Sequence, residues 1–308
     1  MSGSTADARF VHPALFYRSD DDYQAKIVPF VTDGLDLGQP VAVAVPAPRL
    51  RLVRDALGAK SSHVTMVDMT HEGRNPGRII AGVLRRFADA HPDQHVRIVG
   101  EPVWPGRTSV EYPACVQHEA LINTAFAGRD VTILCPYDAE GLDATVVADV
   151  YATHPVIWAD DELPNDRYAP DAAIARYNQP LPAPTCDSRV VATPADVTEA
   201  RRFAAELARR LGLAGERVQD LELIATELVT NSIVHTPGPG RIAVWLEDGH
   251  VVCEVADPGT FADPLAGRRP ADPDELGGRG LLLVNDLADL VRVHTGPAGT
   301  QIRALLRV

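Results

Sequence analysis

The 308-residue sequence is poor in sulfur and in aromatic side chains: it has 4 cysteines, 3 methionines, and 6% Phe, Trp and Tyr. The cysteines lie far apart and form no Cys-x-x-Cys pair, which suggests neither a disulfide framework nor a zinc site. Most of them stand in apolar runs, where cysteine packs as a small buried hydrophobe. No apolar run reaches the length of a membrane span, and the N-terminal MSGSTADARF lacks the apolar core of a signal peptide. We therefore expect a cytoplasmic protein with no membrane partner.

Basic residues are outnumbered by acidic ones. Lys and Arg number 29 against 42 Asp and Glu, and the net charge is −13. This charge disfavours DNA as a direct partner, because the phosphate backbone is itself anionic. An acidic protein can still regulate transcription by holding a basic protein partner. A chain of this length can form two domains, each with its own core.

The familiar nucleotide and metal motifs are absent from the first half of the chain. Neither G-x-x-x-x-G-K-[ST] nor G-x-G-x-x-G occurs there, and His118-Glu119 does not begin an HExxH motif because Ile122 replaces the second histidine. Instead, Val- and Ile-rich runs alternate with helical patterns. The expected strands are 40–46, 63–69, 95–101 and 130–138, and the expected helices lie near 20–37, 48–57, 76–91, 111–126 and 140–150. This alternation predicts an α/β domain with a mostly parallel sheet and helices on both faces. In such sheets, ligands bind beyond the carboxyl ends of the strands.

A break in the hydrophobic pattern divides the chain. Residues 159–188 are rich in Pro and Asp and end in a Pro-Leu-Pro-Ala-Pro segment that we expect to be extended. Their few apolar residues, which include Tyr168, Ile174 and Tyr177, predict a linker that packs on a neighbouring domain. The expected division is therefore a domain at 1–158, a linker at 159–188 and a domain at 189–308.

Several short motifs occur together in the N-terminal domain. They include PFVTDGLDLGQPV (29–41), NPGRII (75–80), VRIVGEPVW (96–104) and ILCPYD (133–138). As a set they resemble the MEDS domain, a sensory domain related to the DcmR type of repressor. The resemblance implies a RecA-like sheet that senses a small ligand or docks a partner, with no defined reaction. The residues that we place near its cleft are His12, Glu101, Trp104, Glu111, His118, Tyr137 and His154. Glu111 and His118 also have a structural interpretation, in which they tie a helix to the sheet.

In the second half of the chain, polar residues stand at four-residue intervals on a predicted helix. In ELIATELVTNSIVHTPG, Glu227, Asn231 and His235 fall along one face, and Ile224 and Leu228 fall largely on another. A solvated face is one explanation for this pattern. Phosphoryl transfer is another, because an Asn oxygen is a ligand for Mg²⁺ and a nearby Glu can take the proton of an attacking hydroxyl.

Glycine-rich turns follow this helix. A predicted hairpin has Asp248-Gly249 at its turn and ends in Asp257-Pro258-Gly259. Asp257 can accept a hydrogen bond from an exocyclic amine, while Gly259 lets a flat ring approach the backbone. The run Gly277-Gly278-Arg279-Gly280 opens an apolar helix and predicts a phosphate cradle. Gly299-Thr300 then precedes a final strand.

The order of these motifs resembles the N, G1, G2 and G3 boxes of the GHKL ATPase superfamily, and most closely the anti-sigma-factor serine kinases of the RsbW and SpoIIAB type. The resemblance covers residues from about 189 to 308 and implies an α+β fold, the Bergerat α/β sandwich, that binds ATP and Mg²⁺. It implies that Glu227 is the catalytic base and Asn231 the Mg²⁺ ligand. The residues that it places around the nucleotide are Asn231, Asp257, Gly259, Gly278, Arg279, Gly280 and Thr300. Pro258 departs from the superfamily, in which Asn is frequent, and removes a backbone donor.

The two resemblances together predict a regulator that acts by partner switching. A domain that senses a small molecule would control an ATP-dependent kinase, which phosphorylates a Ser or Thr of a STAS-type anti-anti-sigma factor and sequesters a sigma factor. Residues 260–276 would form a lid over the nucleotide, and the chain would pair as a homodimer. The alternative is a nucleotide-gated module that holds a sigma factor or STAS protein and transfers no phosphate. A third reading is a small-molecule sensor whose GHKL domain serves mainly for dimerisation. Glu227 favours the enzyme, because a pure binder would not need the acid.

Overall fold

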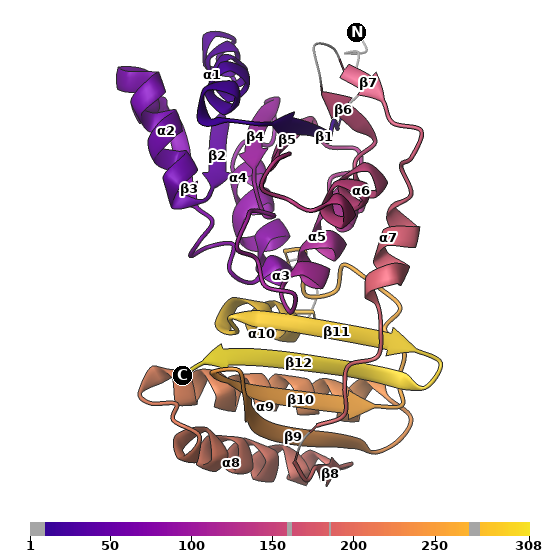
Figure 1. The fold of residues 1–308 in the computed structure, drawn as a ribbon. Helices are drawn as coiled ribbons and strands as arrows, with labels where there is room; N and C mark the ends of the chain where they lie inside the picture. Colours follow the sequence, from indigo (N-terminus) through magenta and orange to yellow (C-terminus); the bar gives the residue numbers. More distant parts are fainter. Residues whose placement is uncertain (1–9, 159–161, 185, 271–277) are drawn as a thin grey trace, which may run out of the picture. The chain divides into compact units, whose positions relative to one another are not determined.

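The structure of the protein, a computed structural model, describes residues 10–158, 162–184, 186–270 and 278–308 (Figure 1). It divides into two compact units. The first unit comprises the residues up to Arg74 and Ile79–Tyr177, and the second unit comprises Asn75–Arg78 and Asn178–Val308. Among the described residues, no helix combines the length and the apolar character that crossing a membrane requires.

A seven-stranded sheet forms the centre of the first unit. Its strands are β1 (Pro13–Tyr17), β2 (Val41–Val45), β3 (Val64–Asp68), β4 (Val96–Gly100), β5 (Val131–Asp138), β6 (Val156–Trp158) and β7 (Glu162–Pro164). The order is β3-β2-β4-β5-β1-β6-β7, and every pairing is parallel except that of β6 with β7. Because β1 lies between β5 and β6, the start of the chain is brought beside residues that follow it by more than a hundred positions.

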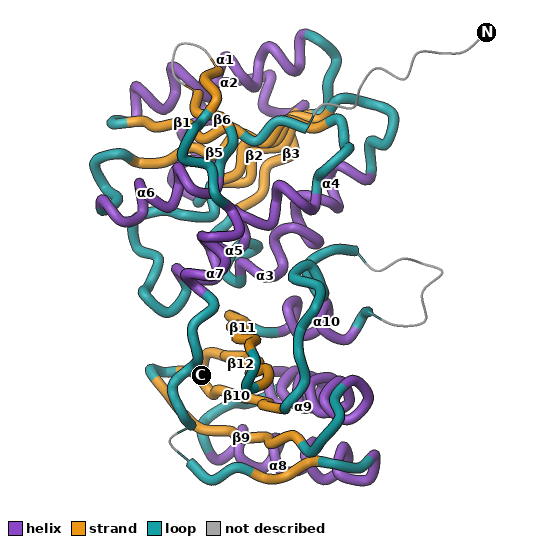
Figure 2. Tube along the Cα trace, turned by 90° about the vertical axis from the view of Figure 1, so that its right-hand side faces the viewer, coloured by secondary structure: helices purple, strands orange, loops and turns teal. Residues whose placement is uncertain are grey.

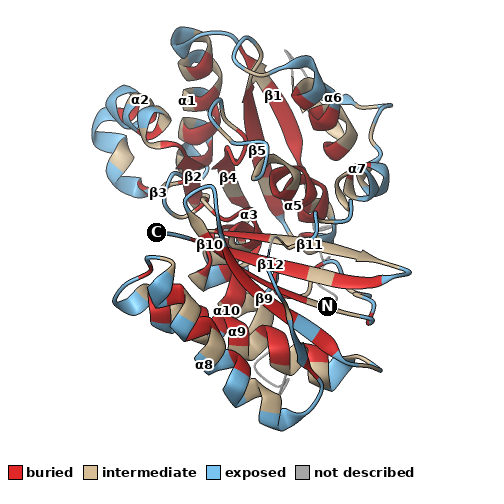
Figure 3. Ribbon diagram, turned by 60° about the horizontal axis from the view of Figure 1, so that its bottom comes forward, coloured by how far each residue is buried: buried red, intermediate tan, exposed pale blue. Residues whose placement is uncertain are grey.

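Helices cover both faces of this sheet (Figure 2). The helical elements of the first unit are α1 (Asp20–Asp36), α2 (Ala47–Leu57), the 3-10 turn Gly58–His63, the π-helical turn Ile80–Arg85, α4 (Arg86–Asp89), α5 (Tyr112–Ala125), α6 (Ala144–Thr153) and α7 (Pro170–Tyr177). The short helix α3 (Pro76–Ile79) lies mostly within Asn75–Arg78, which belong to the second unit. Side chains fix the start of two of them: Ser19 Oγ accepts from the Asp22 amide at 3.1 Å, and Asp143 Oδ1 accepts from the Thr145 amide at 2.8 Å. The central strands β2, β4 and β5 are buried on both sides, as their continuous Val and Ile runs predict (Figure 3). The predicted α/β class is confirmed.

The segment expected to be a linker contains regular structure. Strand β7 pairs with β6, and helix α7 packs against α5 and α6. Asp149 of α6 holds α7, because it accepts hydrogen bonds from Arg176 Nη1 at 2.7 Å and from the Tyr177 hydroxyl. The next residue, Asn178, already belongs to the second unit.

The second unit is a five-stranded antiparallel sheet with helices on one face (Figure 2). Its elements are β8 (Arg189–Val191), α8 (Pro194–Arg210), α9 (Glu216–His235), β9 (Gly240–Glu247), β10 (His250–Asp257), α10 (Gly280–Leu287), β11 (Leu290–Gly296) and β12 (Gly299–Arg307), with the strand order β11-β12-β10-β9-β8. Ala200, Ala204 and Ala208 are buried along one face of α8, where their small side chains let α9 approach closely. The predicted α+β class of this unit is confirmed.

Gly299, the first residue of β12, is required by the backbone around it. Its φ is +125°, and a Cβ atom at this position would lie 2.2 Å from the carbonyl oxygen of Asp257. Gly249, at the β9–β10 turn, also has a positive φ of 72°, but a Cβ atom there would meet nothing within 4 Å. We expect Gly299→Ala to lower the free energy of unfolding by roughly 2 kcal/mol or more, and clearly more than the matched Gly249→Ala. Urea unfolding of the two variants measures this difference, and equal losses would contradict it.

Candidate functional site

Helix α9 presents an acid and an amide on one of its faces. Glu227 and Asn231 are half-buried, and His235, the last residue of the helix, is exposed. On the other side, Ile224 and Leu228 are buried in the core beneath the sheet. The four-residue spacing therefore produces the two faces that the sequence predicts.

Gly280 brings the start of α10 against this polar face. A Cβ atom on Gly280 would lie 2.5 Å from Glu227 Oε2 and 3.5 Å from Asn231 Nδ2. A glycine is needed for this approach. Two residues earlier, Gly278 has a φ of +82°, which favours glycine as well. The structure thus places the glycine-opened helix directly beside Glu227 and Asn231.

A second wall forms at the end of β10. Asp257 is the last residue of this strand and pairs with Thr300 of β12. Its Oδ1 accepts from the Gly259 amide at 2.9 Å, and the Thr300 hydroxyl donates to the Gly259 carbonyl at 2.9 Å. A Cβ atom on Gly259 would lie 2.5 Å from Cγ2 of Thr236, the residue that follows α9. The Asp257–Gly259 turn is therefore held against the end of the helix that carries Glu227 and Asn231.

The other predicted nucleotide residues fall at the edges of this arrangement. Arg279 is the N-cap of α10 and is exposed. Thr300 is buried, and its hydroxyl also lies 3.0 Å from that of Thr295, so it holds the turn in place. Gly277 and residues 271–276 of the predicted lid lie outside the described residues.

These features fit a nucleotide with a bound metal. The N-terminus of α10 offers backbone N–H groups to an anion, and glycines leave room for it. The Asn231 side chain supplies an oxygen of the kind that Mg²⁺ prefers, with an acid one turn away. The Asp257 carboxylate is fixed by Gly259, where a flat ring can approach a backbone without side chains.

The residues predicted near the sensory cleft do not form a single cluster. His12, Tyr137 and His154 are buried together: the two imidazole rings are 4.2 Å apart, and the Tyr137 hydroxyl lies 3.4 Å from Nε2 of His154. Glu101 lies at the end of β4, where its Oε1 accepts from the Tyr17 hydroxyl at 3.0 Å. The group of His12, Tyr137 and His154 and the pair of Glu101 and Tyr17 are therefore separate, because their hydrogen-bond partners differ.

The rest of this set lies elsewhere. Trp104 stacks on the guanidinium of Arg107, 3.8 Å from the ring centre, and Arg107 approaches Glu111 at 3.5 Å. Glu111 also accepts from the Thr108 amide at 2.9 Å just before α5, so it organises the start of that helix. His118 is buried on α5.

Sequence reasoning missed three residues that contact the buried histidines. Glu119 Oε2 lies 3.3 Å from Nε2 of His12, Cys135 Sγ lies 3.4 Å from the same nitrogen, and Asn123 Oδ1 lies 3.1 Å from its Nδ1. Cys135 stands in the apolar run of β5, and this context predicts a small buried hydrophobic side chain rather than a ligand. Glu119 and His118 stand together in a largely apolar helix, and polar side chains in such a helix need partners; this pattern is the signal that the sequence offers.

Glu101 predicts a dependence of stability on pH. Burial raises the pKa of its carboxyl from 4.5 to about 8, against the opposing effects of the Tyr17 hydrogen bond and the Arg49 charge. Between pH 4.5 and 8 the folded chain keeps a proton that the unfolded chain has released, so the free energy of unfolding falls as the pH rises. Glu101→Gln has no such proton to lose. We expect its stability relative to wild type to rise by on the order of a few kcal/mol across this window.

Urea unfolding at a series of pH values tests this expectation. Glu140→Gln, which removes a carboxylate at an exposed position of the same unit, is the matched control. Curves for wild type and Glu101→Gln that stay parallel from pH 4.5 to 8 would contradict the prediction.

Comparison with known protein families assigns both units. Residues 11–155 match the model of MEDS, the MEthanogen/methylotroph, DcmR Sensory domain. Residues 190–306 match the model of the histidine kinase-like ATPase domain. The chain joins a MEDS domain to a histidine kinase-like ATPase domain. The two resemblances drawn from the sequence motifs are thereby confirmed.

Individual relatives resemble the ATPase domain. The serine-protein kinase RsbW of Oceanobacillus iheyensis is 27% identical over 122 residues, which cover 35% of this chain and 77% of the relative. This similarity supports the anti-sigma-factor kinase type within the GHKL group. The solved structure of the RsbU and RsbW domains of a Mycobacterium tuberculosis protein is 18% identical, with a TM-score of 0.29. That match covers 40% of this chain and 32% of the solved chain.

Proposed function

We propose that the ATPase domain is an ATP- and Mg²⁺-dependent protein serine/threonine kinase, which phosphorylates a STAS-type anti-anti-sigma factor and sequesters a sigma factor. The observation that carries this proposal is the approach of Gly280 to Glu227 and Asn231, because it joins an anion-binding helix start to an acid and a metal-ligating amide. The RsbW relative, by its name a serine-protein kinase, supports the class of substrate. The STAS-type partner is proposed from the same kinship.

Each residue then has a defined task. Bound MgATP supplies the phosphoryl group and the charge that the metal neutralises. Asn231 would hold the metal, and the helix start at Gly280 would hold the phosphates. Glu227 would orient the hydroxyl of the partner protein and take its proton. Asp257 would accept a hydrogen bond from the adenine amine through the oxygen that does not bind Gly259.

Incubation of the full chain with labelled ATP and a STAS protein tests the reaction. Label transferred to a Ser or Thr of the STAS protein supports the kinase. ATP-dependent capture of a sigma factor or a STAS protein without transfer supports the alternative, a nucleotide-gated binding module. Glu227 favours the kinase, since holding a partner does not require an acid beside the metal ligand.

Asp257 gives a test of nucleotide binding that is independent of catalysis. Asp257→Asn keeps an oxygen for the Gly259 amide but no longer offers a charged acceptor to the ring amine. We expect the Kd for MgATP to rise about 10-fold or more, as measured by calorimetry on the full chain. Asp248→Asn, in the turn before the same strand, is the control and should bind as wild type does. Unchanged affinity in a folded Asp257→Asn chain would remove Asp257 from the site.

We also propose that the MEDS domain senses a small molecule and that the sensing controls the kinase. The name of the matching family supports the sensory role. A cytoplasmic location and a homodimer complete the proposal, since kinases of this kind act on cytoplasmic partners and pair through the ATPase fold. Sedimentation of the full chain with and without MgATP tests the dimer.

A further inference from the structure

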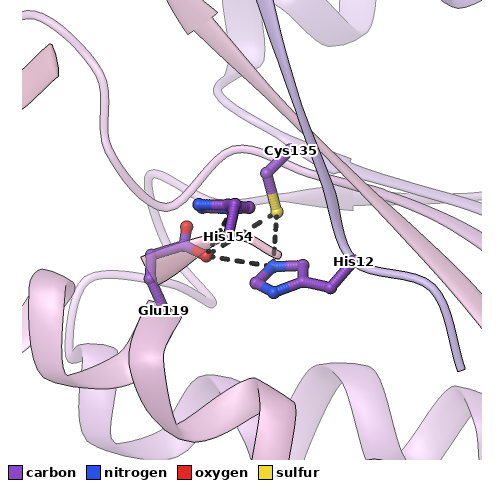
Figure 4. Close-up of side chains that lie close together, drawn as sticks. All are labelled: His12, Glu119, Cys135 and His154. Carbon is purple, nitrogen blue, oxygen red and sulfur yellow. Dashed lines mark hydrogen bonds and ion pairs between the residues drawn. The ribbon is translucent and has the colours of Figure 1, made fainter. Parts of the chain in front are cut away.

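A polar cluster is buried in the MEDS domain where β1, β5, α5 and the end of α6 meet (Figure 4). His12, Glu119, Cys135 and His154 each direct one nitrogen, oxygen or sulfur atom toward a common centre, and these atoms all lie within 4.8 Å of one another. All four side chains are buried. We propose that these residues, called here the Glu119 cluster, bind one divalent transition-metal ion in tetrahedral coordination, and that Zn²⁺ is the ion that fits them best.

Four of the six separations within the Glu119 cluster are close to the edges of a tetrahedron, and the other two, from His154 Nε2 to His12 Nε2 and to Cys135 Sγ, are within 4.8 Å. Glu119 Oε2 lies 3.3 Å from Nε2 of His12 and 3.4 Å from Nε2 of His154. Cys135 Sγ lies 3.4 Å from Nε2 of His12 and 3.7 Å from Glu119 Oε2. Zinc bonds of about 2.0–2.1 Å to nitrogen or oxygen and about 2.3 Å to sulfur give tetrahedral edges of about 3.3–3.6 Å. Four edges already have nearly this length, and a movement of His154 toward His12 and Cys135 would complete the tetrahedron.

The outer nitrogens of both histidines are already committed as donors. The Asn123 amide group donates to the backbone carbonyls of Ala120, at 3.2 Å, and Thr153, at 2.8 Å, so its Oδ1 must face His12. Nδ1 of His12 therefore donates to Asn123 Oδ1 at 3.1 Å. Nδ1 of His154 lies 2.9 Å from the Val150 carbonyl, which can only accept. Both neutral rings then direct the lone pair of Nε2 at the centre.

Lone pairs that face one another without a cation between them are unfavourable. The two Nε2 atoms and Glu119 Oε2 all act as acceptors, whereas the donors are two: the thiol of Cys135 and the Tyr137 hydroxyl, 3.4 Å from Nε2 of His154. Without a metal, each further proton at this centre would place an unpaired positive charge on a buried imidazole, which is costly. The second carboxylate oxygen, Glu119 Oε1, is buried with no hydrogen-bond partner among the described residues. A metal ion provides the missing positive charge at one point.

The charges also balance for a divalent ion. A thiolate and a carboxylate carry two negative charges, and two neutral imidazoles carry none, so M²⁺ makes the buried group neutral. Sulfur with nitrogen ligands in a tetrahedron favours zinc over Mg²⁺ or Ca²⁺, which prefer oxygen. The hydrogen bonds from Nδ1 of each histidine are the outer contacts that such sites use to orient their ligands. Of the four residues, Glu119 also lines a small pocket, together with Val103, Tyr112 and Tyr137.

Metal binding by the full chain tests the proposal. After removal of metals with a chelator, Zn²⁺ competition with a chromophoric chelator should show one tight site per chain, and Zn²⁺ should raise the Tm. Co²⁺ should give the intense visible bands of a tetrahedral ion and a sulfur-to-cobalt charge-transfer band. Cys135→Ser should remove that band and weaken Zn²⁺ binding by about 100-fold or more, which exceeds the loss typical of outer contacts. Asn123→Ala, which frees only the outer nitrogen of His12, should weaken it by about 10- to 100-fold.

The other cysteines provide matched controls. Cys115→Ser removes a buried thiol of α5, and Cys186→Ser removes an exposed one. Both variants should bind Zn²⁺ and Co²⁺ as wild type does. Equal Zn²⁺ affinity in wild type and Cys135→Ser would overturn the proposal. If Cys135→Ser does not fold, the wild-type Co²⁺ spectrum decides: an octahedral spectrum, or one without the charge-transfer band, also overturns it.

Discussion

Replacing Glu227 with alanine is expected to lower phosphate transfer by roughly 10²–10⁴-fold, the range for a lost general base, while MgATP binds almost as tightly as before. The reason is positional. Glu227 lies beside Gly280 at the start of α10, yet as an acid it is no ligand for the phosphate anions that this helix start would hold. Asn231→Ala should instead lose both binding and transfer, because the metal leaves with its ligand. Single-turnover transfer and calorimetry on the full chain separate the two effects.

Glu222→Ala serves as the control for this pair. Glu222 lies on the same helix and is half-buried, but it pairs with Arg209 at 3.5 Å, away from Gly280. Its removal should leave transfer unchanged. A Glu227→Ala chain that transfers phosphate at the wild-type rate would show that the catalytic role assigned to Glu227 is wrong.

Elements with strong internal patterns could be predicted from the sequence. The strands β2, β3, β4 and β5 were predicted within one residue at most of their ends, because continuous Val and Ile runs bounded by polar residues have few other interpretations. The β9–β10 hairpin was equally clear, since Asp248 and Gly249 adopt the positive φ values that its turn requires. Strands β1, β6, β7, β8 and β11 were not predicted. The first four have at most five residues each and depend on their sheet neighbours for pairing, and β11 follows α10 directly with only a short connection.

The two sites differed for a related reason. In the ATPase domain, Glu227 and Asn231 share one helix face, and the glycines mark close approaches, so local spacing indicated the arrangement. In the MEDS domain, His12 and His154 meet because β1 lies between β5 and β6. The spacing of residues along the chain does not predict this strand order. Cys135 stands in an apolar strand, and Glu119 is one of three adjacent polar residues buried on α5, so neither position alone points to the cluster.

The final prediction concerns coupling between the two domains, and it rests on Asn178. The preceding residue, Tyr177, is anchored to Asp149 in the first unit. Asn178 Nδ2 donates to the Thr295 carbonyl at 2.8 Å in the second unit. The Thr295 hydroxyl accepts from the Phe261 amide at 3.0 Å, at the start of the predicted lid, and lies 3.0 Å from the Thr300 hydroxyl that holds Gly259. Hydrogen bonds therefore connect Asn178, at the domain junction, to the Asp257–Gly259 turn, where the adenine is proposed to bind.

A ligand that shifts α7 would also shift Asn178 and its hydrogen bond to Thr295, because Asn178 directly follows Tyr177, the last residue of α7. Coupling of this kind is typically about 1–3 kcal/mol, or roughly 5- to 150-fold in affinity. We expect the fragment from Asn178 to Val308, which also lacks the Asn75–Arg78 segment of the second unit, to differ from the full chain by a factor in that range in MgATP affinity, with a corresponding change in transfer rate. Asn178→Ala in the full chain should move both values toward those of the fragment.

Gln301→Ala makes this test specific. Gln301 accepts from the Leu181 amide at 3.1 Å. Gln301→Ala therefore removes a contact of the segment that begins at Asn178 and leaves the hydrogen bonds of Thr295 in place. That variant should behave as the full chain does, because the series of hydrogen bonds from Asn178 to Gly259 remains intact. Identical rates and affinities for fragment, full chain and Asn178→Ala would instead mean that the MEDS domain acts independently of the kinase. A Gln301→Ala chain that matches Asn178→Ala would place the coupling in the docking of the segment as a whole rather than in Thr295.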